Sequence, residues 1–174
     1  MKRTTAWILA LLSLAAVLAI PVSADRVGIK YSVFWAYGTV DEYYLDPKLY
    51  AVGEIPPVPD VIPTKEDATR LFHFVHWDRP PEPVKGDSFY YAMYEVYEKK
   101  YAMNHDTVVT IADATVHLDV LSGKNVDTLS NPDVNQNDLV SIQDTTLILD
   151  YLKDANPPIV SAKALLQEGK QQKN

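Results

Sequence analysis

A repeat with a period of 31 residues constrains this chain more than any other feature of its sequence. Residues 102–121 and 133–152 align without a gap, and eight of their twenty positions are identical. Identity in register at that level indicates a duplicated unit that folds twice in the same way. The identical pairs are Asn104/Asn135, Val109/Val140, Ile111/Ile142, Asp113/Asp144, Thr115/Thr146, Leu118/Leu149, Asp119/Asp150 and Leu121/Leu152.

The second copy places oxygen-bearing side chains at alternate positions of a loop, with the spacing of an EF-hand calcium site. Calcium is a hard cation that takes six to eight oxygen ligands at about 2.3–2.6 Å. Odd positions of a tightly wound loop direct their side chains inward, and position 12 begins the following helix. The predicted ligands are Asp133, Asn135, Asn137 and Asp144 at positions 1, 3, 5 and 12, the backbone carbonyl of Leu139 at position 7, and Ser141 at position 9 through a water.

The first copy repeats this pattern less completely. Asn104, Asp106 and Asp113 occupy positions 3, 5 and 12, and Val108 occupies position 7. Position 1 is Ala102, which has no side-chain oxygen. We therefore predict a calcium site in the second loop, and a first loop that is either weak or vacant.

Neither copy has glycine at position 6, where the loop backbone turns sharply. Asp138 holds this position in the second copy and tolerates a left-handed conformation better than most residues. Thr107 holds it in the first copy and tolerates that conformation poorly. Val140, at position 8 of the second copy, is predicted to point into the core between the two loops.

A plain pair of helices is the competing interpretation, with the aspartates and asparagines serving as caps and turn residues. It does not explain why four oxygen side chains fall at ligand spacing inside a duplicated segment. Each loop leads into apolar residues at helical spacing, which predicts two helices of about three turns. The helices should end at Ser122–Gly123 and near Asn156–Pro158. The apolar residues are Val116, Leu118, Leu121, Leu147, Ile148, Leu149 and Leu152.

The duplicated loop and helix resemble the type I dockerin domain over residues 102–155. The resemblance rests on the ligand spacing, on Asp at position 12 of both copies, and on Leu-Ser-Gly after the first helix. It implies that calcium orders the fold and that the helices bind a cohesin-type domain. The near-identity of the two copies separately suggests a pseudo-two-fold axis, with either helix able to face the partner in one of two orientations. The partner-facing residues that it implies are Ile111, Ala112, Asp119, Val120, Ile142, Gln143, Asp150 and Tyr151.

Residues 25–98 differ from this acidic segment and are predicted to form a small β-rich domain. Residues 30–37, 71–77 and 88–97 are rich in aromatic and β-branched residues, which favours strands. Four prolines within residues 55–63 indicate an extended connection. Residues 28–97, with Tyr31-Ser32-Val33-Phe34-Trp35 and the Gly53–Pro59 segment, are similar to internalin B-type repeats. That similarity implies a β-grasp-like sheet that serves as a spacer or adhesion module.

The ends of the chain and its charge limit the possible environments. A cleaved signal peptide is predicted over residues 1–24, with a retained anchor as the alternative. The prediction rests on the basic residues Lys2 and Arg3, an apolar run over residues 6–20 and a small-residue end at Ala24. After removal of the signal peptide, we expect a secreted or cell-surface protein that does not span the membrane. Without Lys2 and Arg3, 14 basic residues face 23 acidic residues, which argues against nucleic acid as a partner. The chain has no cysteine, so a bound ion is one available source of stability.

Enzymatic chemistry is not predicted. His73, His76 and Asp78 are residue types that bind metals, but positions three apart on a strand should face opposite sides, which argues against a metal cluster. No nucleophile elbow or phosphate-binding glycine loop is present in the sequence. Sugar binding is the alternative function for the N-terminal domain, through an aromatic platform that competes with a simple core. The aromatic residues concerned are Trp35, Tyr37, Tyr43, Tyr44 and Trp77.

The sequence thus predicts an α+β protein of two small domains. A β-grasp-like sheet spans residues 25–98, and an all-α, dockerin-like pair of calcium loop-helix units spans residues 101–157. Residues 158–174 are predicted to be a polar tail, either helical or disordered. The predicted cofactor is Ca²⁺ and the predicted partner is a cohesin-type domain. A carbohydrate-binding module and a calcium-stabilised structural protein without such a partner are the alternatives.

Overall fold

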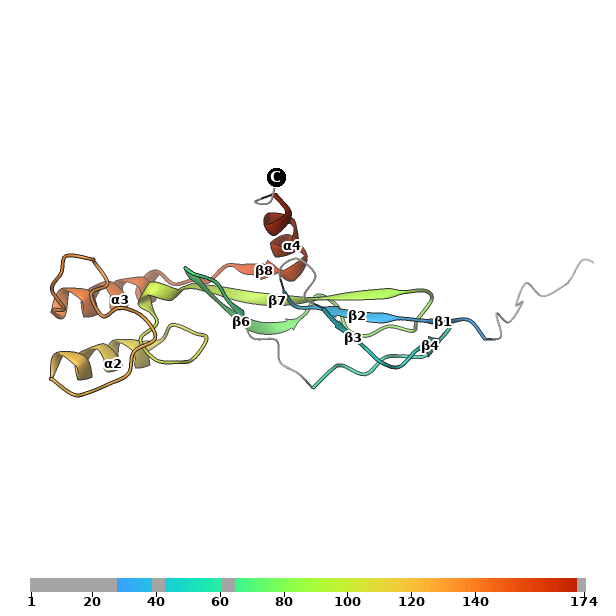
Figure 1. Cartoon of the computed structure of the whole chain (residues 1–174), viewed down its shortest axis with the longest axis horizontal. Helices are drawn as coiled ribbons and strands as arrows, with labels where there is room; N and C mark the ends of the chain where they lie inside the picture. The colour runs from blue at the N-terminus through green and yellow to red at the C-terminus, as the bar shows by residue number, and fades with distance from the viewer. Residues whose placement is uncertain (1–27, 39–42, 61–64, 172–174) are drawn as a thin grey trace, which may run out of the picture.

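The computed structural model describes residues 28–38, 43–60 and 65–171. The predicted signal peptide lies outside these residues. The fold is α+β, as predicted, and the molecule is elongated (Figure 1). Helices α2 (Ile111–Leu121) and α3 (Ile142–Asp154) lie at one end, and a curled sheet forms the rest. Within the described part of the chain, no helix has the length and apolar character needed to cross a membrane.

The sheet is built around strand β7 (Ser88–Glu98), which is the longest strand. The order is β3-β2-β7-β6-β5, and β8 also pairs with β7. The β2–β7 pair is parallel, whereas β6 and β8 run antiparallel to β7. Strands β1 (Lys30–Tyr31) and β4 (Tyr50–Ala51) form a separate two-stranded ladder. The remaining bounds are Val33–Ala36 for β2, Tyr43–Leu45 for β3, Lys65–Glu66 for β5, Arg70–Trp77 for β6 and Ile159–Ser161 for β8.

Alternation along the strands produces the core of the sheet, because side chains two residues apart share a face. Tyr90, Ala92 and Tyr94 of β7 are all buried. Trp35 of β2 is also buried, and its ring stacks on that of Tyr90 with centroids 4.5 Å apart. The strands predicted over residues 30–37, 71–77 and 88–97 are therefore confirmed, and their large aromatic residues supply much of the buried surface.

A β-bulge corrects the prediction that His73 and His76 face opposite sides. The register between β6 and β7 shifts between Phe74 and His76. His73 consequently lies opposite Glu95, and His76 lies opposite Met93, two residues away on β7. Because residues two apart on a strand share a face, the bulge turns both histidines to the same side. They still form no cluster, since His73 Nδ1 lies 3.0 Å from the Thr107 hydroxyl and His76 Nδ1 lies 2.7 Å from its neighbour's carbonyl.

The helical part follows β7 through a 3₁₀ turn, η1 (Lys99–Tyr101). Both predicted helices are present, and each begins with a complete capping box. Helix α2 ends where predicted, because Gly123 adopts a positive φ of 80° that suits a residue without a Cβ. Helix α3 ends at Asp154, before the two prolines.

The chain then returns to the sheet, which the sequence did not reveal. Strand β8 pairs with β7, and helix α4 (Ala162–Gln171) packs beside it (Figure 1). Ala162 and Leu165 are buried against Phe72, Ala92 and Tyr94. Of the two forms predicted for the tail, the helix is the one observed. The helical part is thus inserted in the chain between β7 and β8, two strands that pair with each other. The sheet therefore contains the strands on both sides of the helical part.

Removing the Leu165 side chain should therefore destabilise the sheet and not only the tail. We expect Leu165→Ala to lower the free energy of unfolding by about 2–5 kcal/mol, because a fully buried leucine leaves a cavity. Chemical denaturation followed by tryptophan fluorescence measures this, since Trp35 and Trp77 belong to the sheet. Leu166→Ala is the matched control and should cost less, because Leu166 is half-buried. Equal losses for the two variants would contradict the packing described.

Candidate functional site

Two buried carboxylates organise the loops that precede α2 and α3. We call residues 102–113 loop one and residues 133–144 loop two. Asp113 and Asp144 end these loops and are fully buried. Asp113 accepts hydrogen bonds from the backbone N–H groups of Met103, Asn104 and Thr110 at 2.7–3.1 Å. Asp144 accepts from the N–H groups of Asn135 and Ser141 at 3.1 and 2.9 Å. Each carboxylate therefore ties the start of its loop to the start of its helix.

The sequence repeat continues in the hydrogen bonds within the loops. Asn104 Oδ1 accepts from the Asp106 N–H, and Asn135 Oδ1 accepts from the Asn137 N–H. At the next step Asp106 Oδ1 and Asn137 Oδ1 accept from the N–H groups of Val108 and Leu139. Side chains at positions 3 and 5 thus fold back along both loops in the same way. This similarity indicates a duplicated structure as well as a duplicated sequence.

Loop two adds a carboxylate at position 1. Asp133 is buried, and its two oxygens accept from the N–H groups of Asn137 and Asp138 at 3.1 and 2.7 Å. The Asn137 N–H also donates to Asn135 Oδ1 at 3.1 Å. Because Asp133 Oδ1 and Asn135 Oδ1 lie at equal distances from one nitrogen, the oxygens of positions 1 and 3 lie on the same side of the loop. Loop two therefore brings the first predicted ligands close together.

The backbone of loop two has the left-handed turns that a calcium loop requires. Gln136 and Asp138, at positions 4 and 6, have positive φ values of 58° and 67°. Asp138 thus adopts the left-handed conformation that the sequence predicted it to tolerate. They are the only non-glycine residues with positive φ in the described ranges, so Thr107 of loop one does not make the equivalent turn. The two loops share side-chain bonds but differ in backbone conformation.

Position 1 of loop one belongs to the core between the sheet and the helices. Ala102 is fully buried and packs in one cluster with Leu71 of β6 and with Val109. A carboxylate at this position would be placed among apolar side chains, which is costly without compensating bonds. Thr107, at position 6, lies against His73 of the sheet. Loop one therefore attaches the helical part to the sheet.

The charge and chemistry of loop two suit a hard cation. Burial raises the pKa of Asp144, but the N–H groups of Ser141 and Asn135 outweigh this effect and hold the pKa below its usual value. Asp144 is therefore ionised at neutral pH. In the described part of the chain, no three His, Cys, Asp or Glu side chains gather into a metal-binding group. Of its three aspartates, loop two places two, Asp133 and Asp144, at ligand positions, with amide, hydroxyl and backbone oxygens for the other positions.

The position of Val140 differs from the prediction. Val140 is exposed, whereas its counterpart Val109 is buried. The difference arises from packing. Val109 lies in one buried cluster with Leu71 of the sheet, and Val140 is not part of that cluster. The prediction that Val140 points into a core between the loops is wrong.

The predicted partner-facing residues lie mostly on the outer surface of the helices. Ile111 is 65% exposed and Ile142 is 61% exposed, and Ala112, Gln143 and Asp150 are also exposed. Val120 is half-buried. Asp119 is half-buried and pairs with Lys124, whose Nζ lies 2.5 Å from its carboxylate.

Tyr151 has a role within the chain. Its ring stacks on that of Tyr101 with centroids 4.3 Å apart, and its hydroxyl accepts from the Glu98 N–H at 3.2 Å. These contacts join α3 to the end of β7 and to η1. The structure therefore places Tyr151 at the junction with the sheet, where it is half-buried.

Two exposed leucines extend the outer faces of the helices. Leu118 is 45% exposed and Leu149 is 42% exposed, although the sequence analysis counted both among the apolar residues of helical spacing. Each lies seven residues after an exposed isoleucine, on the same side of its helix. We define stripe one as Ile111, Thr115 and Leu118, and stripe two as Ile142, Thr146 and Leu149. All three positions are identical between the repeats, but identity alone could not mark them as exposed, because the identical pair Asp113 and Asp144 is buried.

The aromatic residues considered for sugar binding are divided between core and surface. Trp35 is buried, and Trp77 and Tyr37 are half-buried in the core clusters. Tyr43 and Tyr44 of β3 are exposed. The sequence analysis did not single out Phe34 and Phe89, which stack nearly parallel with centroids 4.5 Å apart. Tyr43 meets Phe34 edge-on, and this small cluster lies on the face of the sheet away from Trp35, with Phe89 and Tyr43 exposed and Phe34 half-buried.

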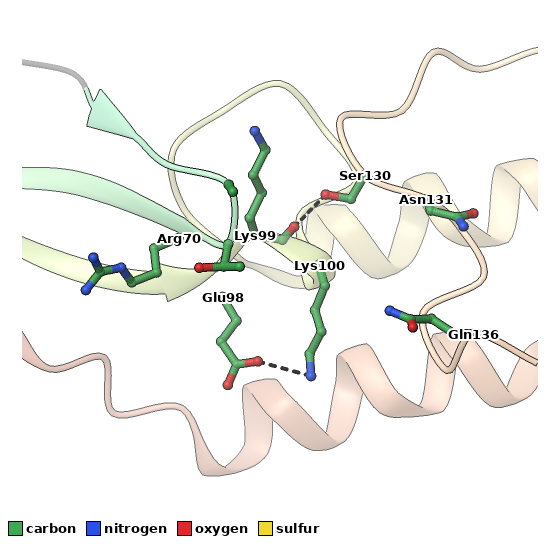
Figure 2. Close-up of a pocket in the computed structure, with 9 residues that line it drawn as sticks. Arg70, Glu98, Lys99, Lys100, Ser130, Asn131 and Gln136 are labelled. Carbon is green, nitrogen blue, oxygen red and sulfur yellow. Dashed lines mark hydrogen bonds and ion pairs between the residues drawn. The ribbon is translucent and has the colours of Figure 1, made fainter. Parts of the chain in front are cut away.

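A cleft of about 620 Å³ lies at the junction of the sheet and the helical part. Figure 2 shows Lys100 directed toward Glu98, and Ser130 directed toward the backbone carbonyl of Lys99. Lys99 pairs with Glu66 at 2.9 Å, and Arg70 pairs with Asp67 at 2.8 Å. Each cation of this cleft thus has a carboxylate partner, so the cleft between the sheet and the helical part carries paired charges.

Comparisons with known proteins add no assignment. No protein-family model, no curated protein and no solved structure matches this chain. The argument for function therefore rests on the geometry of the loops and helices.

Proposed function

We propose that this chain is a secreted, non-catalytic docking protein whose helical part binds calcium and then a cohesin-type partner. The single observation that supports this most strongly is the conformation of loop two. Asp133, the amides of positions 3 and 5, and Asp144 are held around left-handed turns at Gln136 and Asp138. The finer description of the fold, a β-grasp-like domain followed by a dockerin-like domain, belongs to the same proposal.

In this proposal, loop two holds the calcium ion. Asp133, Asn135, Asn137 and Asp144 supply side-chain oxygens, Leu139 supplies its carbonyl, and Ser141 acts through a water. Two carboxylates are a modest charge for a divalent cation, and calcium affinity depends on ligand charge. We expect a dissociation constant of about 10⁻⁴–10⁻³ M, which suits an extracellular protein.

Loop one takes no ion in this proposal. Ala102 is buried against the sheet, and Thr107 does not make the left-handed turn. The backbone N–H groups that donate hydrogen bonds to Asp113 already organise this loop without a cation. The degenerate loop therefore serves as the attachment of the helices to the sheet, with one calcium ion per chain.

The proposed partner surface consists of stripes one and two. Exposed isoleucine and leucine side chains in a row form an apolar surface that suits a protein partner, because burial of that surface on binding is favourable. The two stripes have the same residues at the same spacing on helices related by the repeat. We infer that either helix can face the partner, which gives two orientations of the complex.

Calcium should stabilise the folded chain through loop two. A ligand at about 100 times its dissociation constant adds about 2.7 kcal/mol to the free energy of unfolding. For a chain of this size the Tm should rise by about 5–10 °C. The measurement is thermal unfolding of the wild type and of Asp133→Ala, with calcium and with a chelator.

We expect Asp133→Ala, which gives loop two the residue found at position 1 of loop one, to remove the calcium effect. Asp106→Ala is the matched control, because it removes an exposed acid of loop one. It should keep the full rise in Tm with calcium. A wild-type Tm that is the same with calcium and with chelator would refute the calcium proposal.

The two stripes give a test of the partner. We expect Ile111→Ser with Leu118→Ser, or Ile142→Ser with Leu149→Ser, to weaken cohesin binding by only about twofold, because one of two equivalent orientations remains. All four substitutions together should weaken it by at least about 100-fold. Titration calorimetry with a panel of cohesin domains provides the affinities. Ile55→Ser is the control, since Ile55 is 61% exposed but lies after β4, outside both stripes and both loops.

If no cohesin domain binds while calcium still raises the Tm, the chain is a calcium-stabilised structural protein. Sugar binding is the second candidate, and the cluster in which Phe89 and Tyr43 are exposed beside half-buried Phe34 favours it. Glycan binding that depends on Phe89 would support that candidate.

A further inference from the structure

A buried histidine in the first repeat contacts the beginning of the second loop. His117 of α2 is fully buried. Its Nε2 lies 2.8 Å from the carbonyl oxygen of Pro132, the residue just before loop two. Its Nδ1 lies 2.8 Å from the hydroxyl of Thr145, the residue just after loop two. One imidazole therefore bridges both ends of the loop.

The chemistry of the partners fixes the form of the ring. A carbonyl oxygen only accepts hydrogen bonds, so Nε2 must carry the proton. In the neutral ring Nδ1 is then an acceptor, and the Thr145 hydroxyl donates to it. In this form the ring donates one hydrogen bond and accepts the other, so both partners are satisfied. An aliphatic side chain of similar size would leave the buried Thr145 hydroxyl without this bond.

The Pro132 carbonyl is also part of the turn that positions Asp133. It accepts from the Val134 N–H at 3.0 Å, which closes a three-residue turn with Asp133 at its centre. The Asp133 N–H donates to Asn131 Oδ1 at 3.1 Å. Holding the Pro132 carbonyl therefore holds the backbone of the residue at position 1.

The repeat shows that this contact is not a general requirement of the helix pair. The residue that corresponds to His117 in the second repeat is Ile148, which is equally buried. A hydrophobic residue thus satisfies packing at this position. A histidine is needed only where a carbonyl and a hydroxyl face it, and both belong to the edges of loop two.

We infer that His117 is a positioning residue for calcium in loop two. The first repeat, whose own loop attaches to the sheet, supplies through α2 the side chain that pre-shapes the ligand loop of the second repeat. This inference rests on the proposed calcium site. Hydrogen bonds made to a metal ligand itself change metal affinity by about 10–100-fold when they are removed. His117 contacts Pro132 and Thr145, the neighbours of the ligands Asp133 and Asp144, so the expected change is at the lower end of that range.

The test compares calcium affinity with stability of the calcium-free chain. We expect His117→Leu to weaken calcium binding by about tenfold or more, measured by titration calorimetry on the full chain. His117→Gln should keep most of the affinity, because the glutamine amide donates to Pro132 and its oxygen accepts from Thr145. Ile148→Val is the matched control, and should lower the Tm in chelator while leaving calcium affinity within about twofold.

Nitrogen NMR of the wild-type imidazole tests the inference without any substitution, and so remains decisive if His117→Leu does not fold. We expect the Nε2-protonated tautomer, with resonances that shift when calcium is added. A wild type that binds no calcium refutes the proposed function itself. A wild type that binds calcium, while His117→Leu binds it equally well or the imidazole resonances do not respond, refutes only the role of His117.

Discussion

The burial of two aspartates, Asp113 and Asp144, is the constraint on which the helical part of this protein depends. A carboxylate removed from water is strongly unfavourable unless hydrogen bonds compensate for it. Here the compensation comes from backbone N–H groups at the start of each loop and at the start of each helix. The same contacts close the loop and cap the helix, so loop and helix form as one unit. Beside these carboxylates, a buried cluster of Met103, Ala114, Val134 and Ile148 packs the two units together.

The two units use this common arrangement differently. In loop one, position 1 is an alanine packed against Leu71, and the threonine at position 6 contacts His73. In loop two, position 1 is a buried aspartate, and positions 4 and 6 adopt left-handed turns. One copy of the repeat is thus adapted to join the sheet, and the other keeps the geometry of a cation loop. His117 links the two adaptations, because it reaches from α2 to both ends of loop two.

The sheet and the helical part are continuous on both sides of the insertion. Strand β7 runs directly into η1, and α3 returns into β8, which pairs with β7 again. Tyr151 on Tyr101 and the paired cations of the junction cleft fill the space between the two parts. A cation that orders α3 would therefore also limit the motion of β8 and α4. In the proposed function, this arrangement would hold the sheet at a fixed angle to the surface formed by stripes one and two.

Much of this structure followed from local sequence patterns, and the rest did not for identifiable reasons. The repeat, both helices, their caps and the left-handed Asp138 were all encoded within short segments. The return of β8 was not visible, because residues 159–161 gain their strand conformation only from distant β7. The bulge after Phe74 reversed a face assignment that assumed regular alternation. Val140 was placed wrongly because loop spacing does not say which face has a neighbour. Helical spacing likewise did not show that Leu118 lies on an exposed face, and His117 was not singled out because its partners Pro132 and Thr145 lie 15 and 28 residues away.

The central claim is that one loop of the duplicated pair holds calcium and the other does not. Calcium stoichiometry, measured by titration calorimetry on the chain from residue 25 onward, tests it most directly. The account predicts one ion per chain, with the ion lost when Asp144 is replaced by asparagine. No detectable binding, or two equivalent ions per chain, would contradict it.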